Sequence, residues 1–274
     1  MFLVILCWSR ESDYRRPGLN EKYPIAFTLS GLPLENTPCL IVWGHGWAMD
    51  KDAFKPFAVA LATRATHIRV DFPGFGDSPL PPPNWGTADY ADALAELVGS
   101  YRSIKKIIYV GHSFGGRVGI QMAARHREVV DGLFFVAGAG LPRKRSLYQT
   151  LKMRSKVYTF KALKHLAPFL GLNIDKLRAK FGSADYRNAG PLRQIFVRVV
   201  REDLSEQAQQ IKCPTQLIYG SNDRETPPEI GERLQKLIPH ATLAVLLGQD
   251  HYSVLAAGRH VIIKRLVDFI ESLP

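Results

Sequence analysis

Six short apolar runs, separated by segments with helical spacing, constrain the fold of this 274-residue chain most strongly. The runs are continuously apolar and do not alternate with polar residues, which is typical of strands buried on both faces of a sheet. They span residues 39–44, 67–72, 106–111, 132–138, 215–220 and 243–248. Alternating strands and helices predict an α/β fold with a mostly parallel sheet and right-handed crossovers.

Two helical segments and one further strand complete this pattern. Apolar residues with helical spacing follow Thr87, a candidate N-cap, and a second apolar stripe covers residues 261–270. The apolar run from Phe2 to Trp8 is far shorter than the ~20 residues of a membrane-spanning helix. We interpret it as a first strand, with a clipped start or a targeting segment as alternatives.

The cysteines indicate the redox compartment. Cys7, Cys39 and Cys213 lie far apart in the sequence, and their number is odd. This spacing argues against a disulfide framework and against a cysteine zinc site, and it favours a reducing compartment. We therefore expect a cytoplasmic protein.

The stretch between residues 139 and 205 breaks the alternation, because it contains no strong strand and is unusually basic. From Leu141 to Arg201 there are fifteen Lys or Arg residues and two acidic residues, whereas the net charge of the whole chain is +11. The rest of the chain is therefore close to neutral. We expect a helical, basic insertion at 139–205 between two parts of one core domain, 1–138 and 206–274.

A serine flanked by glycines follows the run at 106–111, in the sequence Gly111-His112-Ser113-Phe114-Gly115. This G-x-S-x-G pattern between a strand and a helix is typical of a nucleophile elbow, a tight turn that exposes the serine hydroxyl above the sheet. A Cβ atom at either glycine would crowd such a turn. The amides that begin the following helix point to the same place, where they stabilise developing negative charge. Ser113 is therefore the candidate nucleophile.

A serine nucleophile needs a base, and in this order of elements the histidine follows both the serine and the acid. Of the eight histidines, three come late enough: His240, His251 and His260. His240 leads into the last predicted strand, and His260 falls in the C-terminal helical pattern. His251 follows the last strand at its carboxyl end, where the active loops of α/β sheets gather. We therefore choose His251 as the base.

The acid is expected after a strand as well. Asp223 comes three residues after Gly220, at the end of the strand before the last. A buried aspartate there would fix the histidine tautomer and stabilise the charged imidazole. Glu225 is a weaker second candidate. Asp250 is adjacent to His251 in sequence, which is too close for its side chain to approach the ring well.

The segment His45-Gly46-Trp47 follows the run at 39–44, so its amides are expected to face the serine. We assign the oxyanion hole to the backbone N–H groups of Trp47 and Phe114. Trp47 either walls the substrate pocket or packs in the core. His45 is a candidate second base or substrate contact, or it holds its loop in place. His112, next to Ser113, is a further candidate substrate contact.

These motifs together resemble the α/β-hydrolase superfamily, in particular its cap-bearing branch of small esterases, lactonases and C–C hydrolases. The segments HGW, DFPGFGDS, GHSFGG, GSNDRETP and GQDHYSV occur in the family's order and extend over nearly the whole chain. The resemblance implies a helical cap after the sixth strand, where 139–205 lies, and structural roles for Asp71 and Asp77. Asp250 stands where the family more usually has a glycine.

The residues favour a serine hydrolase that forms an acyl-enzyme on Ser113 without a metal or an organic cofactor. A serine at this position argues against haloalkane dehalogenases and epoxide hydrolases, in which a carboxylate attacks carbon. A C–C hydrolase, a thioesterase and an acyltransferase keep the same triad and stay open. A weakly catalytic ligand-binding receptor is a further alternative.

The partner is expected to be a small molecule. An anionic substrate is one option, because a basic insertion over a pocket would concentrate anions. Binding of nucleic acid or an anionic membrane through the insertion is a less favoured alternative. Both a monomer and a homodimer are compatible with the sequence.

Overall fold

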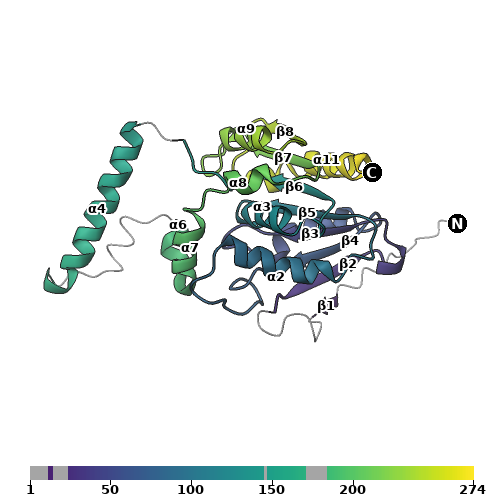
Figure 1. Ribbon diagram of the computed structural model, residues 1–274, viewed down its shortest axis with the longest axis horizontal. Helices are drawn as coiled ribbons and strands as arrows, with labels where there is room; N and C mark the ends of the chain where they lie inside the picture. The colour runs from purple at the N-terminus through teal and green to yellow at the C-terminus, as the bar shows by residue number, and fades with distance from the viewer. Residues whose placement is uncertain (1–11, 15–23, 145–146, 171–183) are drawn as a thin grey trace.

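The computed structural model describes residues 12–14, 24–144, 147–170 and 184–274. Within these residues an eight-stranded sheet forms the centre of the molecule, in the order β1-β2-β4-β3-β5-β6-β7-β8 (Figure 1). Neighbouring strands from β4 to β8 are parallel, and the pairs β1–β2 and β2–β4 are antiparallel. The strands are β1 (Ser12–Tyr14), β2 (Phe27–Gly31), β3 (Leu40–Gly44), β4 (Thr66–Val70), β5 (Ile107–His112), β6 (Gly132–Val136), β7 (Thr215–Gly220) and β8 (Ala241–Leu246). This architecture confirms the predicted α/β-hydrolase fold class.

Helices cover both faces of the sheet, because successive strand side chains point to opposite sides. On β3, Leu40 and Val42 join the core cluster beneath α2, α3, α8 and α9, whereas Ile41 and Trp43 join the cluster beneath α1, α10 and α11. The helices of these two layers are α1 (Lys55–Ala60), α2 (Thr87–Gly99), α3 (Phe114–Arg125), α8 (Ser205–Gln209), α9 (Pro228–Leu237), α10 (Ser253–Ala256) and α11 (Arg259–Ser272). Two short 3-10 helices, η1 (Leu34–Asn36) and η2 (Lys51–Phe54), lie in the loops around β3.

Most predicted elements are present, with three differences. β8 begins two residues before the predicted run and lies at the sheet edge, so its side chains are partly exposed and the expected burial on both faces is wrong. The apolar runs do not predict β2. Thr87 is the first residue of α2, and the N-cap is Gly86, whose amide donates to the Asp89 carboxylate at 2.7 Å. The strand predicted at 2–8 lies outside the described residues.

The strand register brings the loops of interest to one edge. Gly44 at the end of β3 pairs with Gly111 near the end of β5, and Gly220 at the end of β7 pairs with Leu246 at the end of β8. The loops that follow these four strands therefore begin side by side, because the strands are parallel. Ser113, Asp223 and His251 belong to these loops, so the sheet itself brings them together.

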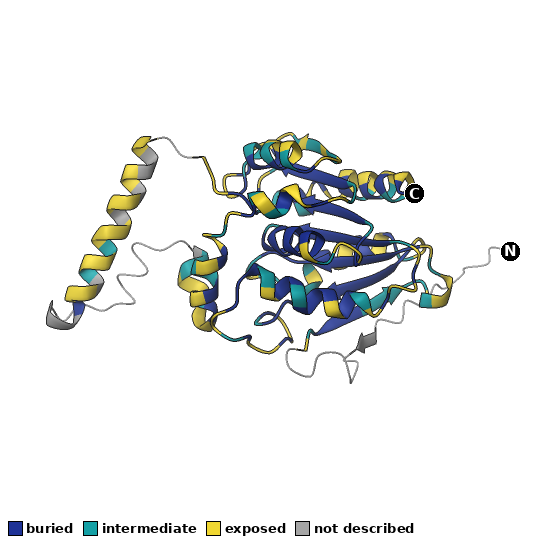
Figure 2. Ribbon diagram, in the orientation of Figure 1, coloured by how far each residue is buried: buried dark blue, intermediate teal, exposed yellow. Residues whose placement is uncertain are grey.

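The insertion after β6 has two parts that differ in packing. The long helix α4 (Leu147–Leu170) stands away from the sheet, and α6 (Ala184–Asn188), η3 (Gly190–Leu192) and α7 (Arg193–Val199) lie against the core (Figure 1). Figure 2 shows that α4 is largely exposed along its length, whereas the strands are buried. In the described part of the chain, no helix has the length and apolar character needed to cross a membrane.

Candidate active site

Ser113 occupies a strained turn between β5 and α3. Its φ angle is 49°, in the left-handed region that side chains with a Cβ rarely adopt. The turn needs close backbone contact on both sides of the serine. A Cβ on Gly111 would lie 2.7 Å from the Gly115 carbonyl carbon, and a Cβ on Gly115 would lie 2.2 Å from the Gly44 oxygen. Glycine is therefore required at both positions of the predicted elbow.

The three residues expected to form a triad are in hydrogen-bond contact. Nε2 of His251 lies 3.0 Å from the Ser113 hydroxyl, and Nδ1 of His251 lies 2.8 Å from Oδ2 of Asp223. Because a carboxylate only accepts, the proton of the neutral imidazole lies on Nδ1, and Nε2 is free to accept from the serine. This arrangement allows the serine proton to pass to His251 during nucleophilic attack.

Asp223 is held as an anion by its surroundings. Oδ1 accepts hydrogen bonds from the backbone amides of Glu225 and Thr226, both at 2.8 Å. Burial raises the pKa of the Asp223 carboxyl, but the hydrogen bond and charge of His251, together with these two amides, outweigh burial, and the net pKa is lowered. The carboxylate therefore stays charged and keeps His251 oriented.

The structure separates Asp223 from the two other acidic candidates. Oε2 of Glu225 lies 3.9 Å from Nε2 of His251, the nitrogen that faces Ser113, so it is on the wrong side of the ring to replace Asp223. Asp250 turns away: its carboxylate accepts from the amides of Tyr252 and Ser253 at the start of α10, at 3.0 and 2.8 Å. The aspartate at the position where glycine is more usual therefore caps a short helix.

The amides assigned to the oxyanion hole belong to the turn after β3 and to the start of α3. Phe114 is the first residue of α3, so its amide has no acceptor within the helix. The rings of Trp47 and Phe114 pack edge to face with centroids 5.4 Å apart. Trp47, Phe114 and Ser113 line one cavity, which places Trp47 at the pocket wall while its ring also packs on Phe114.

This cavity has a volume of about 410 Å³ and combines core and insertion residues. Its apolar wall includes Leu141, Phe196 and Val199 from the insertion. The charged residues in the wall are Arg117, Arg143, Asp185, Arg201 and Glu225. An apolar cavity with a few charged groups next to the serine suits a small organic substrate.

His45 and His112 are buried behind the cavity, which corrects the expectation that they contact the substrate. Both rings are 0% exposed, and neither lines the cavity. Nε2 of His45 accepts from the Phe72 amide at 3.0 Å, and Nδ1 donates to the Gly46 oxygen at 2.7 Å, so this ring holds the loop after β3. His112 donates from Nε2 to the His251 carbonyl oxygen at 3.0 Å and thereby helps to hold His251 in place.

The loop after β4 has the structural role expected of it. The Asp71 carboxylate accepts from the Lys51 amide at 2.7 Å, from Lys51 Nζ at 2.8 Å and from the Asp77 amide at 2.9 Å. Lys51 also forms an ion pair with Asp77. These contacts fix the loop at the rim of the sheet and leave neither carboxylate in the cavity wall.

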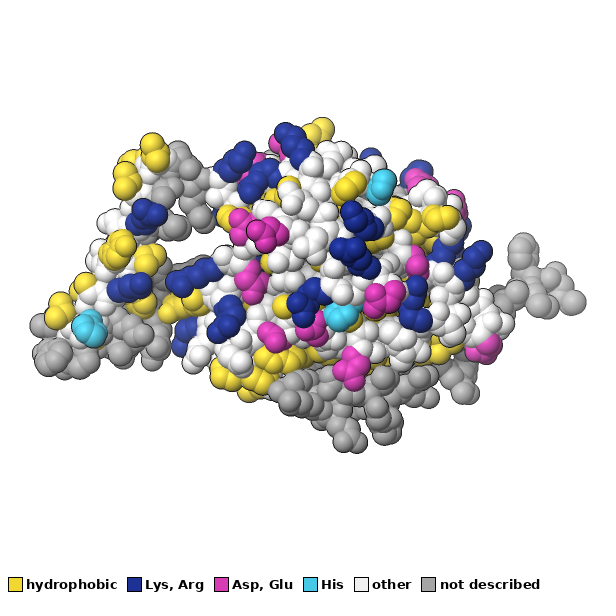
Figure 3. Space-filling model, in the orientation of Figure 1, with side chains coloured by type: hydrophobic (Ala, Val, Ile, Leu, Met, Phe, Trp, Pro, Cys, Tyr) yellow, Lys and Arg dark blue, Asp and Glu magenta, His cyan; other side chains and the backbone are white. Residues whose placement is uncertain are grey.

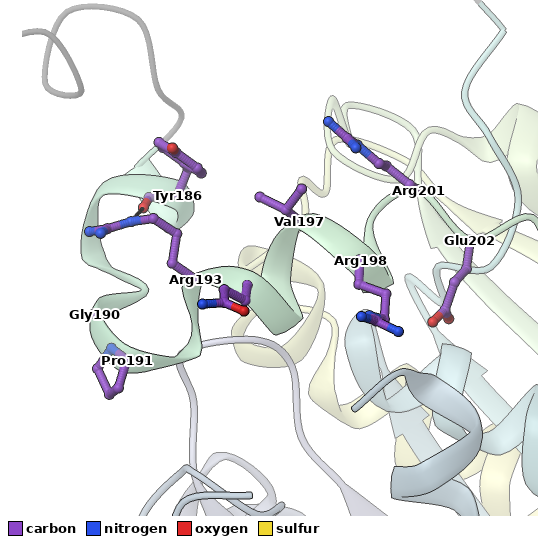
Figure 4. Close-up of a pocket in the computed structure, with 9 residues that line it drawn as sticks. Tyr186, Gly190, Pro191, Arg193, Val197, Arg198, Arg201 and Glu202 are labelled. Carbon is purple, nitrogen blue, oxygen red and sulfur yellow. Dashed lines mark hydrogen bonds between the residues drawn. The ribbon is translucent and has the colours of Figure 1, made fainter. Parts of the chain in front are cut away.

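A second hollow, with a volume of about 980 Å³, lies along α6 and α7 (Figure 4). Arg193 lies beside Tyr186 at one end, and Arg198 and Glu202 lie at the other. The hollow shares Arg201 with the active-site cavity but contains none of the three triad residues. Within the described ranges, no group of three His, Cys, Asp or Glu side chains is arranged to hold a metal ion.

Two residues of the site were not identified from the sequence. The Thr226 hydroxyl lies 2.9 Å from Oδ2 of Asp223, 2.9 Å from the Ala137 oxygen and 3.1 Å from Nδ1 of His251. Thr226 lies in the GSNDRETP segment, three residues after Asp223. This position near the candidate acid was the available signal, but only the acidic residues of the segment were considered as candidates. Arg117 lines the cavity, and its position four residues after Ser113 on a helix was the available signal.

Comparison with known proteins identifies the family that this chain is similar to. The family model described as "Alpha/beta hydrolase family" matches residues 40–262. A pimeloyl-[acyl-carrier protein] methyl ester esterase of Chromobacterium violaceum is 29% identical over 247 residues, which cover 85% of this chain and 94% of that protein. A 2-(acetamidomethylene)succinate hydrolase of Mesorhizobium japonicum is 24% identical over 250 residues, which cover 85% and 88%.

Solved structures show the same fold. The enol-lactonase from Burkholderia xenovorans has a TM-score of 0.69 at 21% identity, covering 92% of this chain and 98% of that one. A membrane phospholipase A described as a bacterial virulence factor has a TM-score of 0.70 at 23% identity, covering 96% and 87%. Since the family model matches more than half of the sequence, and the fold agrees, the chain belongs to the alpha/beta hydrolase family.

Proposed function

We propose that this protein is a serine hydrolase that cleaves a small-molecule ester through an acyl-enzyme on Ser113. The observation that carries the proposal is the continuous contact from Ser113 through His251 to Asp223, at 3.0 and 2.8 Å, on a strained elbow beside a cavity. Relatives that are named as ester hydrolases support the same reaction class.

In the proposed reaction, Oγ of Ser113 attacks the ester carbonyl carbon while Nε2 of His251 takes the hydroxyl proton. The amides of Trp47 and Phe114 hold the negative charge that develops on the carbonyl oxygen. His251 then gives its proton to the departing alcohol, and an acyl-serine remains. Water, deprotonated by His251, attacks this ester, releases the carboxylic acid and returns the serine hydroxyl. Asp223 stabilises the imidazolium in both steps.

The proposed function assigns residues 139–205 as a cap in two parts, of which the part around α7 closes the cavity. Phe196 of α7 packs on Trp47 with ring centroids 5.0 Å apart, so the cap touches the proposed oxyanion region directly. The cytoplasm is the proposed compartment, and the free thiols of Cys39 and Cys213 suit its reducing conditions.

The direct test compares the wild type with Ser113→Ala. The alanine variant should lose about a millionfold in kcat toward any ester that the wild type cleaves. A fluorophosphonate probe should label the wild type once and should not label the variant. Labelling at another residue would overturn the assignment.

A panel of substrates tests the reaction subclass. Thioesters, lactones and vinylogous diketone acids separate ester hydrolysis from thioester and C–C cleavage, and added alcohol acceptors test for acyl transfer.

A second candidate function concerns α4 and an anionic membrane surface. Exposed apolar side chains (Leu147, Leu151) lie on the same helix as exposed cations (Lys152, Arg154), and its sequence contains no acidic residue (Figure 3). An interfacial helix combines these two features, whereas nucleic-acid binding needs only the charge. Sedimentation with vesicles that contain anionic lipid, absent with neutral vesicles and lost in Lys152→Glu/Arg154→Glu, is the expected result. Equal sedimentation of this variant would contradict it.

A further inference from the structure

Arg117 is a buried arginine in the wall of the active-site cavity, and the proposed reaction makes no use of it. It lies on α3 four residues after Ser113, and 8% of its surface is exposed. Four residues correspond to about 6 Å along a helix axis, and helical side chains lean toward the N-terminus. The side chain of Arg117 therefore extends toward the end of α3 where Ser113 lies.

The guanidinium of Arg117 has few protein partners for its five N–H donors. Nη1 donates to the Glu202 backbone oxygen at 3.1 Å, and across the described ranges this is its one hydrogen bond, with no ion pair. A buried charge is costly unless it is paired and hydrogen-bonded. The remaining donors of Arg117 are therefore available to a group that enters the cavity.

The two acidic residues closest in the chain to this contact are bound elsewhere. The Glu202 carboxylate accepts from the Thr87 amide at 3.1 Å and from the Thr87 hydroxyl. The Asp203 carboxylate accepts from the amide and hydroxyl of Ser205, at 3.1 and 2.5 Å. Burial lowers the pKa of Arg117 to about 10, although the charges of Glu202 and Asp203 raise it. Arg117 therefore stays positively charged at neutral pH.

We propose that Arg117 binds a carboxylate on the acyl half of the substrate. The inference rests on the proposed function, because it places an ester next to Ser113 in the same cavity. A guanidinium matches a carboxylate with two parallel hydrogen bonds, which gives both affinity and orientation.

The charges around His251 assign this carboxylate to the acyl half. The departing alcohol must lie close to Nε2 of His251, which returns the proton to it. Oε2 of Glu225 lies 3.9 Å from that nitrogen, and Asp185 lines the same cavity, so an anionic alcohol would be repelled there. Arg117 lies on α3 and donates to the Glu202 backbone oxygen, whereas Glu225 is the residue next to Nε2 of His251. A monoester of a short dicarboxylic acid has the matching charge distribution.

The apolar wall fits the part of such a substrate between its two ends. Leu141, Val199 and Ile230 line the cavity together with Arg117 and Ser113. A short methylene chain would lie against these side chains while its ends meet the serine and the arginine. The exposed Arg143 and Arg201 lie in the same wall and add a more distant positive field.

The test compares mono-p-nitrophenyl glutarate with p-nitrophenyl pentanoate, a neutral ester of equal chain length. Arg117→Gln should lower kcat/KM for the glutarate ester by about 10- to 100-fold more than for the pentanoate ester, mainly through KM, because a hydrogen bond to a charged group is lost. Arg117→Lys keeps the charge and should recover part of this loss. Arg198→Gln removes an exposed cation that lies outside the cavity, and it should change both esters equally.

Equal losses for the two esters in Arg117→Gln, or no loss for either, would overturn the proposal and leave Arg117 a structural role at Glu202. Thermal unfolding checks that each variant folds.

If the wild type cleaves neither ester, the proposed function fails separately, and a binding measurement decides the role of Arg117. Calorimetric titration of monomethyl glutarate into Ser113→Ala should then show binding that disappears in Ser113→Ala/Arg117→Gln. Persistent binding in the double variant would contradict the carboxylate site.

Discussion

Helices α7 and α4 belong to the same basic insertion, but they relate to the core in opposite ways. α7 buries Ile195 and Val199 in the cluster beneath α2 and α3, and both side chains are 1% exposed. α4 is more than three times as long, and Leu147 and Leu151 on it are 85% and 65% exposed. α7 completes the cavity, whereas none of the described side chains of α4 lies in the cavity wall.

The difference shows that burial of apolar side chains against the core, more than charge, decides which part of the insertion lines the cavity. Both helices are basic, and the sequence of α4 contains five Lys or Arg and no acidic residue. Where the structure describes the side chains, the cations in the cavity wall are Arg117, Arg143 and Arg201, and none of these three lies on α4. Among the described residues, the cations that line the cavity are therefore few compared with the fifteen Lys or Arg residues between Leu141 and Arg201.

After the loss expected for Ser113→Ala, the next largest effect is expected in the loops at the carboxyl ends of the strands. Asp223→Asn should fold normally and lose about 10⁴-fold in kcat, because an amide can hold the wrong imidazole tautomer. Glu225→Gln is the matched control, since its carboxylate faces the other ring nitrogen. Steady-state kinetics on one ester compares them. A crippled Glu225→Gln beside an active Asp223→Asn would show that the acid is misassigned.

A packing variant of α7 tests whether this half of the insertion belongs to the core. Ile195→Ala should lower the free energy of unfolding by about 2 to 5 kcal/mol, because it leaves a cavity in a fully buried cluster. Chemical denaturation of the wild type and the variant gives the difference. A loss below 0.5 kcal/mol would mean that α7 is as loosely held as α4.

Acid should weaken the core through its buried histidines. Burial lowers the pKa of His45 and His67 to about 4 and that of His112 to about 3, in each case as the largest influence. An ordinary histidine titrates near 6.5, so below this pH the unfolded chain binds protons that the folded chain does not. The contribution of the neutral rings to stability is therefore fully present above about pH 6.5. It falls as the pH decreases toward the folded-state pKa values. At pH 5 each ring should lower the free energy of unfolding by about 2 kcal/mol relative to neutral pH.

Denaturation between pH 7.5 and 5 measures this loss. His67→Phe removes one of the three rings and should make the pH dependence shallower by about one bound proton. His67 lies away from the triad, where its Nδ1 accepts from the Trp43 indole at 3.2 Å, so only stability should report the change. An unchanged slope in His67→Phe would show that this ring is already protonated in the folded state.

The strands and the contact among Ser113, His251 and Asp223 could be predicted because each depends on a short pattern and on one rule of topology. Buried parallel strands are continuously apolar, and the loops after them meet at one edge, so Ser113, Asp223 and His251 followed from their positions after strands. β2 (Phe27–Gly31) escaped this rule because it is antiparallel and its side chains become progressively more exposed toward its end. β8 begins two residues before the predicted run because its first two residues include the polar Thr242, which is not part of a continuous apolar run.

The supporting residues could not be predicted because burial and distant contacts decide their roles. His45 and His112 carry ring nitrogens suited to substrate binding, but the fold buries both rings, so they hold backbone groups instead. Thr226 acquires its role only when β7 and β8 bring Asp223 and His251 together. Arg117 is an ordinary helix residue in the sequence. That it forms no ion pair among the described residues depends on Glu202, which is 85 residues away in sequence and whose carboxylate is bonded to Thr87.

The smallest expected effect is on α4, where the comparison with α7 is tested most directly. Leu151→Ser and Tyr158→Ser replace side chains that are 65% and 67% exposed, so folding buries little of their apolar surface. Each change should alter the free energy of unfolding by no more than about 0.5 kcal/mol, the range of ordinary surface substitutions. Chemical denaturation beside Ile195→Ala, under identical conditions, gives the comparison.

Protein concentration separates the ways in which this expectation can fail. A loss above about 1 kcal/mol that is constant with concentration would mean that α4 packs on its own core in solution, and the contrast with α7 would disappear. A loss that grows with concentration would mean that the apolar face of α4 is covered by a second copy of the chain, because only association makes stability depend on concentration. Unchanged stability at every concentration would leave α4 as an exposed apolar and basic helix, which is the form that the proposed membrane contact requires.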